Sequence, residues 1–95
     1  MDTISTVFGS STAANCLLYL QNHGDGHARG IARTFDTSVS QVQKQLKKFE
    51  KSGILKSRMV GSARLYEWND RLPFVNSLKE FLQRILESLS EDVMQ

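Results

Sequence analysis

The chain has 95 residues, of which 40% are hydrophobic and one is a proline; this length and composition suit one folded domain with a single core and exclude a disordered chain. Its one cysteine excludes an internal disulfide, and its longest apolar run, residues 16–20, is far shorter than the roughly 20 residues of a membrane helix. The net charge of +2 is unevenly spread: residues 1–28 carry −2, residues 29–64 carry +7 and residues 65–95 carry −3.

The strongly positive charge of residues 29–64 indicates which kind of partner the protein binds. A cationic middle third attracts phosphates, so a polyanionic partner is favoured. Because the longest apolar run is so short, a membrane partner is not expected. The start of the chain has no basic segment leading into an apolar one, so no signal peptide is predicted. Together with the single cysteine, this predicts a cytoplasmic protein.

Two helices are predicted within the first 35 residues of the chain. Residues 1–8 are weakly patterned and are expected to be partly extended. A helix over about 10–22 is indicated by a serine cap and by apolar residues at helical spacing. Two glycines then break the chain, and a short helix is predicted over about 28–35.

A third helix is predicted from about Val39 to Gly53. Ser38 and Gln41 have the spacing of a capping box, and the glycine is a typical residue at the end of a helix. The apolar positions form one thin stripe, whereas the opposite face exposes serine, glutamine and lysine. This polar face is either an ordinary solvated surface or a surface that meets a polyanion.

The rest of the chain is predicted to form a hairpin and a last helix. Residues 54–60 and 64–68 favour strands and surround a tip of small residues. A final helix is expected over about 73–89. The predicted fold class is therefore mainly α (α+β), with the order α-α-α-β-β-α, as one domain over 1–95 whose core covers about 10–72.

The polar face of the third helix has residue types that suit DNA. Glutamine and serine can bond to base edges, and lysine can reach guanine acceptors or phosphate. We therefore expect four residues to contact bases: Ser40, Gln41, Gln43 and Lys44. A second set is expected to contact phosphates from the helices and from the hairpin: Arg29, Arg33, Thr37, Ser38, Lys47, Lys48, Arg58 and Arg64.

Two segments carry a resemblance to a known family. The segments IARTFDTSVSQVQKQLKKFEKSGILKSR (31–58) and GSARLYEWN (61–69) resemble the winged helix-turn-helix domains of ArsR-like bacterial and archaeal transcriptional regulators, over about residues 8–88. The resemblance implies a dimeric repressor or activator whose third helix enters the major groove of double-stranded DNA and whose wing flanks it. Similar domains also accompany nucleotidyltransferases. The alternative is therefore a protein-interaction module that partners an enzyme and binds DNA weakly or not at all.

The chain departs from the metal-sensing members of that family. Those members carry a cysteine motif in the recognition helix, or histidine and acidic ligands on the last helix. Here the third helix has no cysteine and residues 73–95 have no histidine, so no metal or other cofactor is expected at those places.

The last helix has a wide apolar face. Its apolar residues fill one arc of the helix, and five of them keep the 3-4 spacing of a helix pair. Because a small core leaves part of so wide a face exposed, a homodimer is predicted through Phe74, Val75, Leu78, Phe81, Leu82, Ile85 and Leu89. In the alternative, the helix folds back onto its own domain.

Three smaller features have two interpretations each. His23, Asp25 and His27 have the types of zinc ligands, but the glycines between them favour a plain connection. Cys16 is expected on the buried face of its helix, with a redox switch as the alternative. Tyr66 and Trp68 share one strand face, where packing is favoured over stacking on bases.

No known catalytic motif is present in the chain. It has no phosphate-binding glycine loop, no paired carboxylates at a catalytic spacing and no Ser-His-Asp set. The sequence therefore predicts a protein that is not an enzyme.

Overall fold

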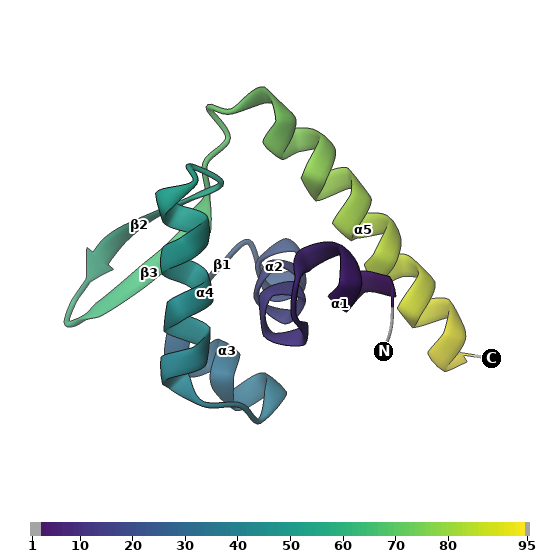
Figure 1. The fold of residues 1–95 in the computed structure, drawn as a ribbon, viewed down its shortest axis with the longest axis horizontal. Helices are drawn as coiled ribbons and strands as arrows, with labels where there is room; N and C mark the ends of the chain where they lie inside the picture. The colour runs from purple at the N-terminus through teal and green to yellow at the C-terminus, as the bar shows by residue number, and fades with distance from the viewer. Residues whose placement is uncertain (1–2, 95) are drawn as a thin grey trace.

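The computed structural model describes the backbone of residues 3–94 and the side chains of residues 6–89. Its elements are α1 (Thr3–Phe8), α2 (Ser11–His23), β1 (Asp25–His27), α3 (Ala28–Phe35), α4 (Val39–Lys51), β2 (Leu55–Val60), β3 (Ala63–Trp68) and α5 (Pro73–Met94). Figure 1 shows α4 and the β2–β3 hairpin on one side of the molecule, α5 on the other, and α2 between them. The predicted fold class and the order of its six elements are confirmed.

Two expectations for the first third of the chain were wrong. Residues 3–8 form a helix rather than an extended segment. The segment between α2 and α3 includes a strand, β1, which pairs antiparallel with β3 and gives a sheet of order β1-β3-β2. Position 26 of this strand needs a glycine because the ring of Tyr19 packs against it. A Cβ at Gly26 would lie 2.7 Å from Tyr19 Cε1.

The start of α4 follows the predicted cap with one difference. Ser38 Oγ accepts a hydrogen bond from the backbone N–H of Gln41, at 3.1 Å, and so satisfies one of the free amides of the first turn. The side chain of Gln41 does not complete a capping box. Its Oε1 instead accepts a hydrogen bond from the hydroxyl of Thr37, at 3.3 Å.

The end of α4 and the turn of the hairpin each depend on a glycine. Gly53 has a φ of +88°, and the bonds from Gly53 N to Glu50 O and from Ile54 N to Phe49 O form a Schellman motif. Gly61 has a φ of +64° and is the first of two residues between the paired Val60 and Ala63. A glycine at this place is typical of the two-residue turns that fit the twist of a hairpin.

The buried side chains form one core beneath α4, the sheet and α5. Val42 and Leu46 of α4 are fully buried, as the thin apolar stripe of that helix predicts, and they pack with side chains of α2, the hairpin and α5. Tyr66 and Trp68 are also buried, which confirms packing rather than base stacking for both. Since the core holds the inner face of α4, the outer face of α4 is turned to solvent.

Cys16 belongs to this core. Its side chain has no exposed surface, and burial raises the pKa of its thiol to about 12. The thiol therefore stays protonated at pH 8, where only about one molecule in ten thousand carries the reactive thiolate. This environment favours the packing interpretation of Cys16 over a redox switch.

The buried thiol leads to a prediction about its reactivity. At pH 8 the folded protein will not react with an aromatic disulfide reagent within minutes, whereas the protein unfolded in guanidinium will react at once. The released thiolate of the reagent measures both rates. Fast reaction of the folded protein, at a rate near that of the unfolded chain, would contradict the buried position of Cys16.

Candidate nucleic-acid interface

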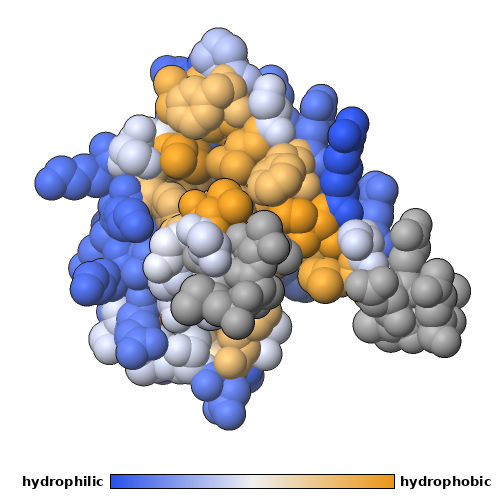
Figure 2. Space-filling view, turned by 45° about the vertical axis from the view of Figure 1, so that its right-hand side comes forward, coloured by the Kyte–Doolittle hydropathy of each residue, from blue (hydrophilic) through white to orange (hydrophobic). Residues whose placement is uncertain are grey.

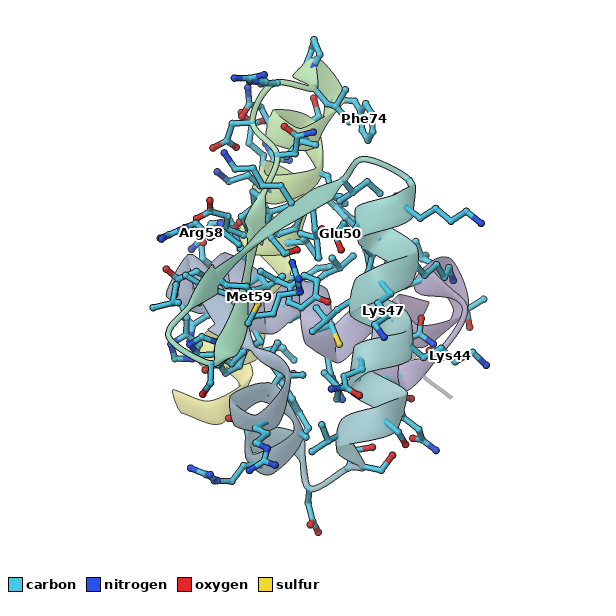
Figure 3. All side chains as sticks on the ribbon, turned by 90° about the vertical axis from the view of Figure 1, so that its left-hand side faces the viewer. Lys44, Lys47, Glu50, Arg58, Met59 and Phe74 are labelled. Atoms are coloured by element: carbon cyan, nitrogen blue, oxygen red, sulfur yellow. The ribbon has the colours of Figure 1, made fainter. Side chains whose placement is uncertain are left out.

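The outer face of α4 presents the residues that were predicted to contact bases. Ser40, Gln41, Gln43 and Lys44 are all exposed, as are Lys47 and Lys48. Figure 3 shows Lys47 on the side of α4 next to the hairpin and Lys44 on the other side. The hydroxyl and amide side chains lie in the first two turns, and the lysines follow toward the C-terminal end of the helix.

The polar side chains at the N-terminal end of α4 form a small network. Besides capping the helix, the hydroxyl of Ser38 lies 3.4 Å from the hydroxyl of Ser40. Thr37 is half-buried and bonds to Gln41. These contacts hold four of the predicted DNA-binding residues together at one helix end.

A groove separates α4 from the hairpin. It is a pocket of about 690 Å³ whose walls come from α3, α4 and both hairpin strands. Four of the predicted DNA-binding residues line it: Arg29, Gln43, Lys47 and Arg64. Residues from positions 29 to 64 therefore meet in one cationic groove.

Met59 and Tyr66 also line this groove, although neither was predicted as a site residue. The side chain of Met59 is 53% exposed, and Figure 3 labels it on the hairpin, across from Lys47 on α4, whereas Tyr66 is buried. Strand alternation could have indicated Met59. Leu55, Ser57 and Met59 share one face of β2, and Leu55 is the residue of that face expected in the core, so Met59 is expected on the side of the strand that faces the rest of the domain. Met59 adds an exposed apolar side chain to a groove that also has cationic walls.

A chain of hydrogen bonds connects α4 to both strands of the hairpin. Arg64 Nη1 of β3 donates to Ser57 Oγ of β2, at 3.0 Å, and Ser57 Oγ donates to Glu50 Oε2 of α4. Tyr66 lies close to these charges: burial raises its pKa, the Glu50 carboxylate raises it further, and Arg64 lowers it. The network sets the position of the hairpin relative to α4.

Removing the central hydroxyl tests this role of the network. In a Ser57→Ala variant the guanidinium of Arg64 loses its partner and the half-buried Glu50 loses a donor, a loss of about 1 kcal/mol. We expect backbone amides of β2 and β3 to exchange about fivefold faster than in the unchanged protein. Ser62→Ala, at the hairpin tip, is the control. Equal exchange in both variants would contradict the role of Ser57.

Arg58 lies on the opposite face of the hairpin from Met59. Its Nε is 3.9 Å from Glu67 Oε1, and Lys56 Nζ is 3.8 Å from the same oxygen. The two cations thus share one carboxylate outside the groove. Arg33 is exposed on α3 and lines a separate pocket together with Arg29.

The histidines beside β1 make contacts within the fold. The ring of His23 lies 4.2 Å from the ring of Tyr19, and His27 Nδ1 lies 3.0 Å from the carbonyl oxygen of Arg64. In the part of the chain that the structure describes, no three His, Cys, Asp or Glu side chains gather as metal ligands would. Nor is any helix of that part long and apolar enough to cross a membrane.

Comparisons with known proteins identify this arrangement. No protein-family model and no curated protein sequence matches the chain. Among solved structures, reduced HlyU from Vibrio cholerae is similar with a TM-score of 0.69 and 15% identity, over 84% of this chain and 81% of HlyU. The AntR antimony-specific transcriptional repressor has a TM-score of 0.63 and 17% identity, over 96% of this chain and 90% of AntR.

A third similar structure is a winged helix-turn-helix domain. The homodimeric winged helix-turn-helix DNA-binding domain of Mb0332 from Mycobacterium bovis, identified as a possible ArsR-family transcriptional regulator, has a TM-score of 0.62 and 15% identity, over 88% of this chain and 75% of that domain. This chain has the winged helix-turn-helix fold of ArsR-like regulators. Its helix-turn-helix is α3 and α4, and its wing is the β2–β3 hairpin.

The winged helix has a second surface, an apolar face on α5. Phe81 and Leu89 are each 45% exposed, and with Ile85 they line a shallow pocket on this helix. The neighbouring α1 adds Phe8, whose ring lies 6.3 Å from that of Phe81, and Val7, which is 59% exposed. Figure 2 shows apolar side chains gathered on one face of the molecule, with hydrophilic side chains around them.

The burial of α5 corrects part of the predicted dimer contact. Val75 and Leu82 have no exposed surface and belong to the core of this winged helix, so a second chain cannot reach them. Leu78 and Ile85 are half-buried against the same core. Phe74, at 54% exposure, faces solvent at the start of the helix. The helix therefore folds back onto its own domain with one face and leaves another face exposed.

Proposed function

We propose that this protein binds double-stranded DNA in a sequence-specific manner as a homodimeric transcriptional regulator. In this proposal α4 enters the major groove, and the wing lies on the backbone or in the minor groove. The observation that carries the proposal is the groove between α4 and the wing, where Arg29, Gln43, Lys47 and Arg64 meet. Cations at the walls of a groove can bind the phosphates of a strand that passes beside the helix.

The residues of α4 have two roles in this proposal. The exposed Ser40, Gln41, Gln43 and Lys44 contact base edges, because amides and hydroxyls can distinguish the donor and acceptor patterns of the major groove. The remaining set contacts phosphates and positions the protein: Arg29, Arg33, Thr37, Ser38, Lys47, Lys48, Arg58 and Arg64. Arg58 is included because its own side chain is exposed, although it pairs with the half-buried Glu67 at 3.9 Å.

The apolar face of α1 and α5 is the proposed dimer contact. Burying each large apolar side chain contributes about 1.5–3 kcal/mol, so pairing the exposed Phe81 and Leu89 of two chains stabilises a dimer. A two-fold axis would place two α4 helices about 34 Å apart, which is one turn of DNA. The homodimeric state of the similar Mb0332 domain supports this arrangement.

The rival function, a protein-interaction module beside an enzyme, is not favoured. The similar AntR is a transcriptional repressor and the similar Mb0332 domain is a DNA-binding domain, which supports a regulator over an enzyme partner. The cationic groove also fits a polyanionic partner better than it fits a module that binds DNA weakly or not at all. We therefore propose a regulator that is not itself an enzyme and acts with DNA as its partner.

A salt titration tests the proposal. The dissociation constant for a mixed-sequence duplex is measured by fluorescence anisotropy at 50 and 200 mM salt. DNA binding through six or more phosphate contacts per dimer weakens by about a thousandfold between these two concentrations. A dissociation constant that is the same at both concentrations, or absence of binding at 50 mM salt, would support the rival function.

A further inference from the structure

The groove between α4 and the wing contains a large exposed apolar side chain, that of Met59. Met59 lines the groove together with Gln43, Lys47 and Arg64, and its side chain is 53% exposed. The proposed dimer contact does not cover Met59, because Figure 1 shows α5 on the other side of the molecule from the hairpin. A single exposed methionine is common on protein surfaces, so the place of Met59 in the groove is the informative feature.

Met59 lies on the face of β2 that is turned toward α4. Residues 55, 57 and 59 share one face of the strand, because side chains alternate along it. Ser57 donates a hydrogen bond to Glu50 of α4, and Leu55 is buried in the core, so this face is turned toward the body of the domain. Figure 3 labels Met59 on the hairpin, across from Lys47 of α4. The thioether side chain therefore faces the groove that α4 borders.

The hydrogen bonds of the wing hold Met59 in place relative to α4. Met59 pairs with Arg64 across the hairpin, and Arg64 Nη1 donates to Ser57 Oγ at 3.0 Å. Since Ser57 in turn donates to Glu50, the strand that carries Met59 is attached directly to the helix. A side chain that is already in place adds to selective binding, because the contact requires little further ordering of the chain.

The other lining residues indicate what this apolar side chain meets. Cations at the walls of the groove suit the phosphates of DNA, and Gln43 presents an amide that can bond to the edge of an adenine. The apolar group that DNA presents in its major groove is the C5-methyl group of thymine, the base that pairs with adenine. Methionine suits such a contact, because its flexible and polarisable side chain adapts to the shape of a small apolar group.

We propose that Met59 contacts the C5-methyl group of a pyrimidine beside the base that Gln43 reads, an inference that rests on the DNA-binding function proposed above. Thymine and 5-methylcytosine carry this methyl group at the same ring position, whereas uracil and cytosine lack it. Burying one methyl group strengthens binding about fourfold, so a dimer on two half-sites gains about fifteenfold.

Duplexes that differ only in this methyl group test the contact. In a duplex recovered by selection, uracil replaces thymine at one position of each half-site in turn, which keeps the base pairing, the sugar and the phosphates. Anisotropy will show a loss of about fifteenfold in affinity at one position or more. If uracil has no effect at any position, the proposal is overturned.

Two variants assign the effect to Met59. Met59→Ala removes the thioether and will bind the thymine and uracil duplexes with nearly equal affinity at a sensitive position. Val60→Ala is the matched control, because Val60 is 45% exposed on the same strand and does not line the groove. In this control the full difference between thymine and uracil will remain. A difference of unchanged size at every position in Met59→Ala would overturn the assignment.

Cytosine and 5-methylcytosine at the sensitive position distinguish the two sources of the methyl group. Tighter binding of the methylated base in the unchanged protein, and not in Met59→Ala, supports a contact with either pyrimidine. Equal binding of the two cytosines, beside the loss with uracil, supports a contact with thymine alone.

The same titrations separate this contact from the proposed function. Met59 carries no charge, so Met59→Ala will keep the salt dependence of binding to a mixed-sequence duplex. Salt-dependent binding that does not distinguish thymine from uracil would overturn the methyl contact alone. Absence of salt-dependent binding would overturn the proposed function and the methyl contact together.

Discussion

Replacing Lys47 with alanine will weaken binding to every duplex, whatever its sequence. Lys47 is exposed, lines the groove and belongs to the proposed phosphate-contacting set, so the proposed dimer would lose two charge-assisted contacts. At about 1.5 kcal/mol each, the loss amounts to about a hundredfold in affinity. The slope of the logarithm of the binding constant against the logarithm of salt concentration will fall by about two, since each phosphate contact contributes about 0.9. Anisotropy titrations over a salt series measure both quantities.

Two further variants separate charge from sequence readout. Arg71→Ala removes an exposed cation outside the groove and will leave affinity and salt slope nearly unchanged. Gln41→Ala will leave the salt slope unchanged and will relax the preference at one base pair of each half-site, where discrimination is about 1–3 kcal/mol. If Lys47→Ala and Gln41→Ala have equal effects on all sequences, the division of roles along α4 is wrong.

Replacing Phe81 with glutamate will convert the proposed dimer into a monomer. Phe81 is 45% exposed, so the monomer tolerates the charge, whereas two opposed carboxylates at an apolar contact repel one another. Each subunit then binds alone and the affinity for a two-half-site duplex falls by at least about a hundredfold, because the second half-site no longer adds its contacts. Light scattering measures the mass, and anisotropy measures the affinity.

Asn76→Glu is the matched control for this variant. It places the same charge at an exposed, polar position of α5, and the dimer and its affinity will be retained. Circular dichroism will show whether both variants keep the fold. A Phe81→Glu protein that remains dimeric would place the subunit contact elsewhere on the molecule.

Local signals in the sequence account for most of the helices and for the hairpin. Ser38 caps α4 and Gly53 ends it as predicted, because caps depend on a few neighbouring residues. The strand β1 was missed because Asp25-Gly26-His27 has little strand preference of its own. It forms by pairing with Leu65, Tyr66 and Glu67, about 40 positions later in the chain.

The helix α1 was missed for a related reason. Its six residues include the β-branched Thr3, Ile4, Thr6 and Val7, and so short a segment has weak helical preference of its own. Its last residue, Phe8, packs against the core and lies beside Phe81 of the distant α5. Contacts between segments far apart in the sequence, rather than local preference, place this helix.

The candidate site was predictable in part. Helical periodicity indicates which residues of α4 face outward, and all six of those assigned to DNA are exposed. It does not indicate that Arg58 pairs with Glu67 outside the groove, or that Arg64 bonds to Ser57 inside the hairpin network. Those contacts depend on strand register, which sets the neighbours across the ladder.

The apolar face of α5 shows a second limit of periodicity. The 3-4 spacing through Val75 and Leu82 is the same for a helix that packs on its own domain and for one that pairs with another chain. Only the fold shows that these two residues are fully buried and that Phe81 and Leu89 remain partly exposed. The residues available to a partner are therefore fewer than the pattern indicates.

Selection of bound duplexes from random DNA tests the central claim most directly. A dimer that presents two α4 helices about one DNA turn apart will enrich sequences with two inverted half-sites whose centres are about 10–11 base pairs apart. Recovered pools that are no different from the starting library, or that share a single unpaired element, would contradict a dimer that reads DNA through α4.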